Sequence, residues 1–255
     1  MPNDFNDGIL DEVAHRPWPM PSGPWIMTQT WNDLLFAHWP VDKRALAEKI
    51  PAGIELDLCH DEAWLGIVPF HMTNVAPRGV PALPWVSAFP ELNVRTYVRV
   101  GDKFGVYFFS LDAANALAVG AARTMFHLPY FSASMEVDVH GAEVRYRSSR
   151  TTRGSPSADF DATSRPTGIT FHPKPRSLEY FLTERYCLFT TNARGDVLSV
   201  DIHHPPWPLQ PADATITRNT MSEAAGIPLP AIAPLLHFSK RQDMVAWPVA
   251  RVRGG

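Results

Sequence analysis

ELNVRTYVRVGDKFGVYFFSL, residues 91–111, has the pattern of a β-hairpin. Residues 91–100 alternate polar and apolar side chains, and this two-residue period is typical of a strand. Gly101-Asp102-Lys103 supplies a turn, and residues 104–111 form a second strand that is apolar on both faces. Because a strand buried on both faces lies inside a sheet rather than at its edge, we expect this hairpin to be central.

The first strand of this hairpin carries two chemically different faces. One face holds Glu91, Asn93, Arg95 and Tyr97, and the other holds Leu92, Val94, Thr96 and Val98. The apolar face must pack against a core. The polar face either lines a polar cavity, where its groups satisfy one another's hydrogen bonds, or faces solvent with a cross-row ion pair. Both alternatives remain open.

Short strands are expected on both sides of the hairpin along the chain. They are residues 25–30, 54–60, 63–68, 70–75, 131–140, 143–150, 159–163, 168–171, 186–191, 197–203, 214–218 and 244–252. Four short helices are expected: residues 42–49 capped by Asp42, 113–123 capped by Asp112, one that begins at the cap Ser177, and 222–225. The 25 prolines fall largely in the connections, since proline cannot donate inside a central strand.

This pattern predicts a β-dominated α+β protein, a barrel or sandwich with a few short outer helices. No linker divides it, so we expect residues 24–255 to form a single domain. Residues 1–23 are polar and rich in proline, and we expect a flexible N-terminal arm.

Composition excludes several classes of protein. The net charge of the 255-residue chain is −3 and no Lys/Arg-rich run is present, so neither nucleic acid nor a membrane surface is an expected partner. No apolar run approaches the ~20 residues of a membrane helix. The N-terminus lacks a signal peptide, and Cys59 and Cys187 suit buried, reduced thiols, so a cytoplasmic location is expected. Exposed-looking Pro/Trp stretches leave room for a homodimer.

A second segment of interest is ARTMFHLPYFSAS, residues 122–134, which contains no lysine. Arg123 ends the expected helix, where a cation interacts favourably with the helix carbonyls, so a purely structural role would account for it. Tyr130 follows a proline and offers a phenol that donates a hydrogen bond or acts as a weak acid. Its alternative role is that of an anchor for the sheet.

Other motifs carry weaker signals. His203-His204 places two imidazoles on opposite faces of a strand, which is poor geometry for a metal, and neither a metal nor a cofactor is expected. Glu184-Arg185-Tyr186 follows an expected helix and is predicted to make a helix-end ion pair. A nucleophile elbow, a phosphate loop and a dinucleotide fingerprint are all missing from the sequence.

Five segments resemble the YqjF-like family, domain of unknown function 2071, over roughly residues 31–247. They are FPELNVRTY (89–97), GVYFFSL (105–111), LPY (128–130), LEYFLTERY (178–186) and HHPPWPL (203–209). This family is similar to the acetoacetate decarboxylase-like superfamily. The resemblance implies a β-cone or barrel with a central pocket and short outer helices.

The same resemblance assigns roles to individual residues. The decarboxylases carry a helix ending in Gly-Arg and a later lysine that forms a Schiff base. Arg123 would match the arginine, Tyr130 the lysine, and Glu91 a pocket glutamate. A phenol has no amine and cannot form an imine. Among the five lysines of the chain, Lys240, which is followed by the cationic Arg241, is considered as a substitute nucleophile.

Three functions remain open. The first is a binding protein for a small carboxylate or keto-acid-like ligand, held by Glu91, Asn93, Arg95, Arg123 and Tyr130. The second is an enzyme with non-imine acid/base chemistry on a carbonyl substrate, such as a hydratase, aldol-type lyase or tautomerase, in which Tyr130 is the acid and Glu91 the base. The third is an accessory domain without a ligand.

Overall fold

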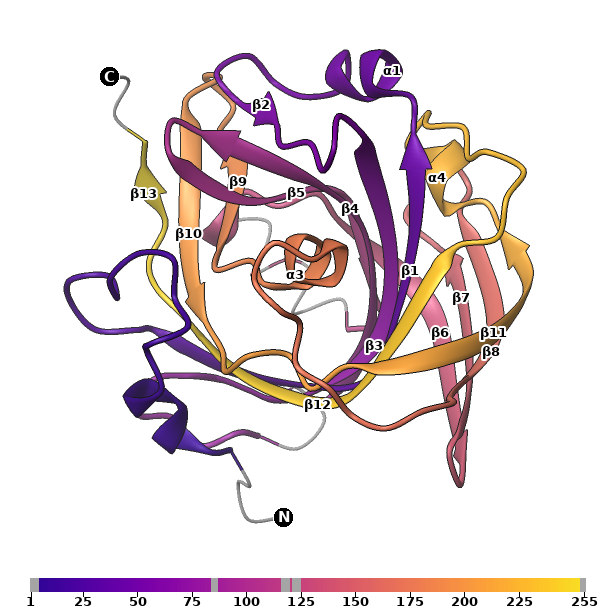
Figure 1. Ribbon diagram of the computed structural model, residues 1–255, viewed down its shortest axis with the longest axis horizontal. Coiled ribbons are helices and arrows are strands. Elements are labelled where there is room, and N and C mark those ends of the chain that lie inside the picture. Colours follow the sequence, from indigo (N-terminus) through magenta and orange to yellow (C-terminus); the bar gives the residue numbers. More distant parts are fainter. Residues whose placement is uncertain (1–4, 84–86, 116–119, 121–124, 253–255) are drawn as a thin grey trace.

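Seven strands pair in a closed ring around a cavity. The computed structural model describes residues 5–83, 87–115, 120 and 125–252. In order of pairing, the ring consists of β1 (Met27–Val41), β3 (Ala63–Pro77), β4 (Phe89–Val100), β5 (Lys103–Ala113), β9 (Cys187–Thr191), β10 (Val197–His203) and β12 (Leu235–Ala246). Figure 1 looks into this ring, with the short helix α3 (Leu178–Thr183) at its centre in that view.

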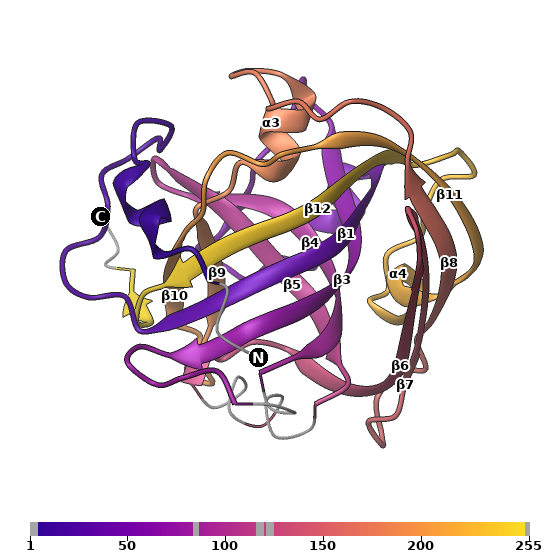
Figure 2. The same ribbon diagram turned by 90° about the horizontal axis from the view of Figure 1, so that it is seen from below.

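Four further strands close a second circuit on one side of the ring. They are β6 (Tyr130–His140), β7 (Glu143–Arg150), β8 (Asp159–Pro166) and β11 (Gln210–Asn219). Together with β12, β1, β3, β4 and β5 they make a closed, mixed barrel of nine strands within the described residues. Figure 2 shows the shared strands running between β9 and β10 on one side and this second layer on the other.

The remaining elements are short. They are the 3₁₀ helix η1 (Asp7–Asp11), α1 (Lys43–Ala47), β2 (Glu55–Leu56), α4 (Met221–Ala224) and β13 (Ala250–Arg251). The predicted fold class, a β-dominated barrel with a few short helices, is confirmed. None of the described helices is long and apolar enough to span a membrane.

The shared strands separate two buried regions. On the side of the second layer, Leu92 and Val94 of β4 pack in one apolar cluster with Tyr146 of β7 and Phe160 of β8, all nearly inaccessible to solvent. Burying each such side chain stabilises the fold by about 1.5–3 kcal/mol. Because side chains alternate along a strand, the other face of β4 is turned toward the cavity.

The predicted hairpin of residues 91–111 is confirmed. Arg99 pairs with Phe104 across the turn, and Gly101 has the positive φ of 59° that a tight turn needs. On the far edge of β5, a side chain at Gly105 would place its Cβ 2.4 Å from the carbonyl oxygen of Cys187. Glycine at this position therefore allows β9 to approach and close the ring.

The two strands predicted at residues 63–68 and 70–75 are a single strand, so this prediction was wrong. β3 runs through Pro69, which pairs with Leu92 of β4. On the opposite side the pairing with β1 shifts register between Asn32 and Ala37, and Asp33 there has a positive φ. A β-bulge already interrupts the ladder at this point, so a residue without a backbone donor is tolerated.

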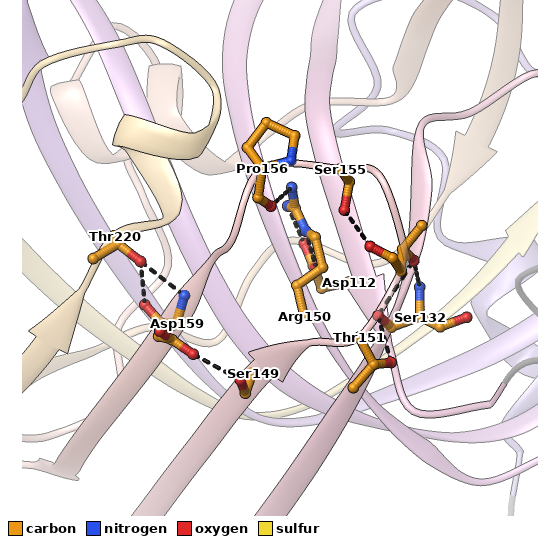
Figure 3. Close-up of polar contacts among 10 residues, drawn as sticks. Asp112, Ser132, Ser149, Arg150, Thr151, Ser155, Pro156, Asp159 and Thr220 are labelled. Carbon is orange, nitrogen blue, oxygen red and sulfur yellow. Dashed lines mark hydrogen bonds and ion pairs between the residues drawn. The ribbon is translucent and has the colours of Figure 1, made fainter.

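Asp112 does not cap a helix, and this prediction was also wrong. It lies in β5, where its carboxylate accepts two hydrogen bonds of 2.7 Å from Arg150 of β7. Figure 3 shows this pair next to Pro156, whose carbonyl also accepts from Arg150. Both side chains are almost completely buried, so the pair ties the cavity ring to the second layer. Most of the helix expected at residues 113–123 lies outside the described residues.

Two other predicted caps are confirmed. Asp42 accepts a hydrogen bond from the backbone of Ala45 at the start of α1, and Ser177 accepts one from Tyr180 at the start of α3. These side chains satisfy backbone donors that a helix leaves free in its first turn. The expected strand at residues 168–171 is reduced to one bridge between Phe171 and Leu209.

The described part of the predicted N-terminal arm lies against the barrel. Ile9 of η1 is buried in a small cluster with Val245 and Trp247. His15 lies 2.8 Å from the carbonyl oxygen of His204, and Arg16 donates to the carbonyl of Ile202. The arm therefore covers the C-terminal end of β10.

Candidate functional site

The ring encloses a cavity of about 430 Å³. Its walls are predominantly apolar and come from every strand of the ring, with a contribution from the segment before β6. The polar side chains in the lining are Gln29, Glu91, Asn93, Arg95, Tyr130, Thr183, Arg185 and His204. A cavity of this size and character is typical of a small-molecule site, where a few polar groups orient the ligand.

β4 supplies a row of polar groups to this cavity. Glu91, Asn93 and Arg95 all line it, and Tyr97 of the same face is buried beneath α3. The alternation seen in the sequence therefore turns the polar face inward, and the solvent-exposed alternative is wrong. The row exists because polar residues recur every second position while Leu92 and Val94 fill the opposite core.

Glu91 and Tyr130 form a hydrogen-bonded pair in the cavity wall. The Tyr130 hydroxyl donates to Glu91 Oε2 over 2.9 Å. Glu91 is 4% exposed, and its burial raises the pKa to about 8, although the bond from Tyr130 opposes the rise. At neutral pH this carboxyl group is therefore mostly protonated. Burial, followed by the adjacent glutamate, raises the pKa of Tyr130 well above its usual value.

Asn93 holds an unsatisfied polar atom at the centre of the row. Its side-chain Oδ1 is buried and accepts no hydrogen bond within the described structure. An unpaired buried acceptor of this kind costs ~1–3 kcal/mol. Because Asn93 lines the cavity, a ligand donor could satisfy it there.

Arg95 brings a positive charge without a neutralising carboxylate among the described residues. Its Nη2 donates to the carbonyl of Leu182 over 3.1 Å, and its Nε is buried without a partner. The guanidinium lies 5.4 Å from the ring centre of Phe36 and 5.8 Å from that of Tyr97. Aromatic faces favour a cation here but do not cancel its charge.

Tyr97 holds α3 over the end of the cavity. Its hydroxyl donates to the carbonyl of Leu182 over 2.8 Å and lies 2.6 Å from Nε2 of His38. Burial and the charge of Arg95 lower the pKa of His38 well below its usual value, so this imidazole is neutral. A neutral ring that carries its proton on Nε2 completes the arrangement as a donor to Tyr97.

Arg185 is a second cavity-lining arginine, which the sequence analysis assigned to a helix-end ion pair. That assignment was wrong: its Nη1 pairs over 2.6 Å with Asp57, which is 128 positions away, and its guanidinium packs 4.3 Å from the ring centre of Phe181. Glu184 instead accepts from the Tyr186 hydroxyl and from the backbone of Trp207. Unlike Arg95, Arg185 is neutralised by a protein carboxylate.

His204 and Trp207 also line the cavity, and neither was predicted as a site residue. His204 is buried, and desolvation lowers its pKa to about 3, so it is neutral. Its Nε2 lies 3.2 Å from the carbonyl of Arg185, and its Nδ1 lies 2.8 Å from the carbonyl of Pro205 and 3.2 Å from Nε2 of Gln242. The indole nitrogen of Trp207 is buried without a partner in the described structure. The HHPPWPL motif was the only available signal for either residue.

The predicted site residues fare differently. Glu91, Asn93, Arg95 and Tyr130 line the same cavity, whereas Arg123 lies outside the described residues. All five lysines fall within the described ranges, and none is among the cavity-lining residues described. Lys240, the lysine singled out in the sequence, is exposed and pairs with Asp33 over 2.5 Å. Among the described residues, no cluster of His, Cys, Asp or Glu could hold a metal.

The chain has recognisable relatives in sequence. A model of the DUF2071 family, described as an uncharacterized conserved protein, matches residues 28–243. The uncharacterized protein YqjF of Bacillus subtilis is 49% identical over 232 residues, which are 91% of this chain and 95% of that protein.

Solved structures with the same fold have much lower sequence identity. Acetoacetate decarboxylase from Legionella pneumophila superposes with a TM-score of 0.60 at 16% identity, covering 99% of this chain and 98% of the other. The enduracididine biosynthesis enzyme MppR, complexed with pyruvate, gives 0.58 at 10% identity with 92% and 93% covered. An acetoacetate decarboxylase-like enzyme from Sphingomonas wittichii gives 0.59 at 12% identity, with 94% and 98% covered. These likenesses establish the fold.

Proposed function

The chain belongs to the DUF2071 family, and from that premise we propose that its barrel binds a small carboxylate or keto-acid-like ligand without forming an imine. The observation that carries this proposal is the cation of Arg95, which lines the cavity and has no carboxylate partner among the described residues. A ligand carboxylate would neutralise it through a charge-assisted, bidentate hydrogen bond.

The other groups of the row suit a carbonyl-bearing acid. Glu91 is mostly protonated at neutral pH and can donate a hydrogen bond, as a neutral phenol can. A carbonyl oxygen at this end would accept from one of them. The unpaired Oδ1 of Asn93 would accept from a hydroxyl of the ligand. MppR, whose fold is similar, has been crystallised with pyruvate, which is a ligand of this chemical class.

The absence of imine chemistry is part of the proposal. The resemblance to the decarboxylases aligns Tyr130 with their Schiff-base lysine, and a phenol cannot condense with a ketone. Three lysines of this chain make ion pairs outside the cavity lining. Lys43 and Lys240 form exposed pairs, and Lys103 pairs with Asp201.

Two measurements test this function. A panel of keto acids and hydroxy acids is screened by thermal unfolding, because a ligand at about 100 times its Kd stabilises the folded state by about 2.7 kcal/mol. For a chain of this size Tm should rise by roughly 5–10 °C. Borohydride treatment with the same acids should give no lysine adduct by mass spectrometry. A panel without any shift contradicts ligand binding, and a reduced adduct contradicts the absence of an imine.

A second function is favoured by the Glu91–Tyr130 pair itself. A carboxyl group with a pKa of about 8 is mostly protonated at neutral pH but keeps a fraction of its carboxylate form, and this mixture of acid and base suits proton transfer. Glu91 as carboxylate would remove a proton from the carbon next to a ligand carbonyl, while the Tyr130 hydroxyl donates to the developing enolate oxygen.

This enzymatic function has its own readout. Exchange of pyruvate methyl protons for deuterium in D₂O, followed by NMR, reports removal of that proton. Wild type should accelerate the exchange, and Glu91→Gln and Tyr130→Phe should each abolish the acceleration. Equal exchange rates with and without the protein would contradict the enzymatic function and would leave the ligand-binding function unaffected.

A further inference from the structure

From the shape and chemistry of the cavity we infer that its ligand is an elongated carboxylic acid, with an apolar body the size of a medium acyl chain or an aromatic ring. This inference rests on the proposed function and specifies the class of ligand. It sets the site apart from one built for acids as short as pyruvate.

The volume is the first observation. A cavity of about 430 Å³ lies within the range of pockets that enclose drug-sized ligands, ~300–1,000 Å³. A three-carbon acid bound at one end would leave most of this space without ligand contacts. Complementary packing, by contrast, is what makes a binding cavity selective.

The distribution of polarity is the second observation. The polar row lies along β4, while β5, β9, β10 and β12 contribute apolar side chains to the lining. Examples are Val106, Phe108, Leu188, Val200, Ile202 and Met244. These side chains offer no hydrogen bond to a ligand and gain most from contact with hydrocarbon.

The length of the polar row is the third observation. Glu91 and Arg95 are four positions apart on one strand, so their Cα atoms are separated by roughly 13 Å along β4. The neutral Glu91–Tyr130 pair thus lies at one end of the row, and the cation of Arg95 lies toward the end covered by α3. A ligand whose carboxylate meets Arg95 therefore has room for an extended body along the row before it reaches the Glu91–Tyr130 pair.

Chain length is therefore the variable to test. The probes are unbranched 2-oxo acids from pyruvate to 2-oxooctanoate, titrated by calorimetry into the full chain. Each methylene buried should tighten binding about threefold to fourfold, so 2-oxooctanoate should bind at least about 100-fold more tightly than pyruvate. The heat-capacity change should become more negative with length, as expected when apolar surface is buried.

Two variants connect the length dependence to this cavity. Val200→Phe fills part of the apolar wall and should weaken 2-oxooctanoate by at least tenfold while changing pyruvate little. Arg95→Ala should weaken both acids by similar factors, because it removes the carboxylate partner. If Val200→Phe does not fold, the length series on wild type decides by itself.

The outcomes separate the two proposals. Arg95-dependent binding that does not tighten with chain length overturns this inference and leaves the proposed function intact. Tight binding of long acids that neither variant weakens also overturns it, since the acids then bind elsewhere. If none of the acids binds wild type, the proposed function fails and the inference fails with it.

Discussion

The Tyr130 hydroxyl donates a 2.9 Å hydrogen bond to Glu91 across the end of β5. Glu91 pairs with Ala113 on one side of that strand, and Tyr130 pairs with Leu111 on the other. The antiparallel β4–β5 ladder and the parallel β5–β6 ladder therefore position an acid and a phenol together from segments 39 positions apart. Four predictions about stability and titration follow from this arrangement and its surroundings, and a fifth concerns ligand binding.

Glu91→Gln should remove a strong pH dependence of stability. Burial raises the pKa of Glu91 from 4.5 to about 8, so the folded state holds a proton that the unfolded state has lost. Stability from this group is complete below pH 4.5 and falls by about 1.4 kcal/mol per pH unit until the pH passes about 8. Urea denaturation across this range should show wild type losing stability relative to Glu91→Gln. The exposed control Glu143→Gln should follow wild type, and parallel curves for wild type and Glu91→Gln would refute the shift.

Tyr130→Phe should raise the pKa of Glu91 further, because the hydroxyl donates a bond that lowers it. A ¹³C NMR titration of the glutamate carboxyl groups should therefore place the midpoint of Glu91 at higher pH in the variant. Tyr146→Phe is the matched control, since Tyr146 is also buried but bonds to the carbonyl of Phe70. A midpoint that stays in place or falls in Tyr130→Phe would show that the hydroxyl does not stabilise the carboxylate.

Arg150→Ala should cost about 3–5 kcal/mol of unfolding free energy, because it leaves the buried carboxylate of Asp112 without its partner. The loss also removes the contact between the guanidinium and the ring of Phe131, 3.9 Å away. Arg145 lies on the same strand and makes an exposed pair with Asp161, so Arg145→Ala should cost ~1 kcal/mol or less. Similar losses in the two variants would mean that the buried pair adds little.

Ile9→Ala tests whether the N-terminal arm is docked. Ile9 is 1% exposed, and truncation of a buried isoleucine costs about 2–5 kcal/mol. Val13→Ala is the control, since Val13 is 43% exposed and should cost little. If Ile9→Ala leaves the unfolding midpoint unchanged, the arm is as flexible as its composition predicts.

The polar row could be predicted because it depends on a local rule. A two-residue period assigns Glu91, Asn93 and Arg95 to one face of a strand regardless of the rest of the fold. The hairpin could be predicted for the same reason, since Gly101 allows the turn that joins β4 to β5. The sequence left open whether this face meets water or a cavity, because that depends on which strands close the ring.

The features that were missed depend on distant partners. Arg185 pairs with Asp57 over 128 positions, and no local pattern connects them. Pro69 stays inside β3 because the neighbouring strand bulges beside it. Asp112 has the type and position of a helix cap, but Arg150 from β7 holds it within a strand. In each case a tertiary contact outweighs the local preference.

The proposed function depends most directly on Arg95, and Arg99 of the same strand provides a matched control. Arg99 is exposed and pairs with Glu55 outside the cavity. A keto acid that shifts the melting of wild type should be titrated by calorimetry into wild type, Arg95→Ala and Arg99→Ala. We expect Arg95→Ala to weaken binding at least tenfold, since a charge-assisted hydrogen bond contributes about 1.5–3 kcal/mol, and Arg99→Ala to bind as wild type does. Equal affinity in wild type and Arg95→Ala would contradict a carboxylate site in this cavity.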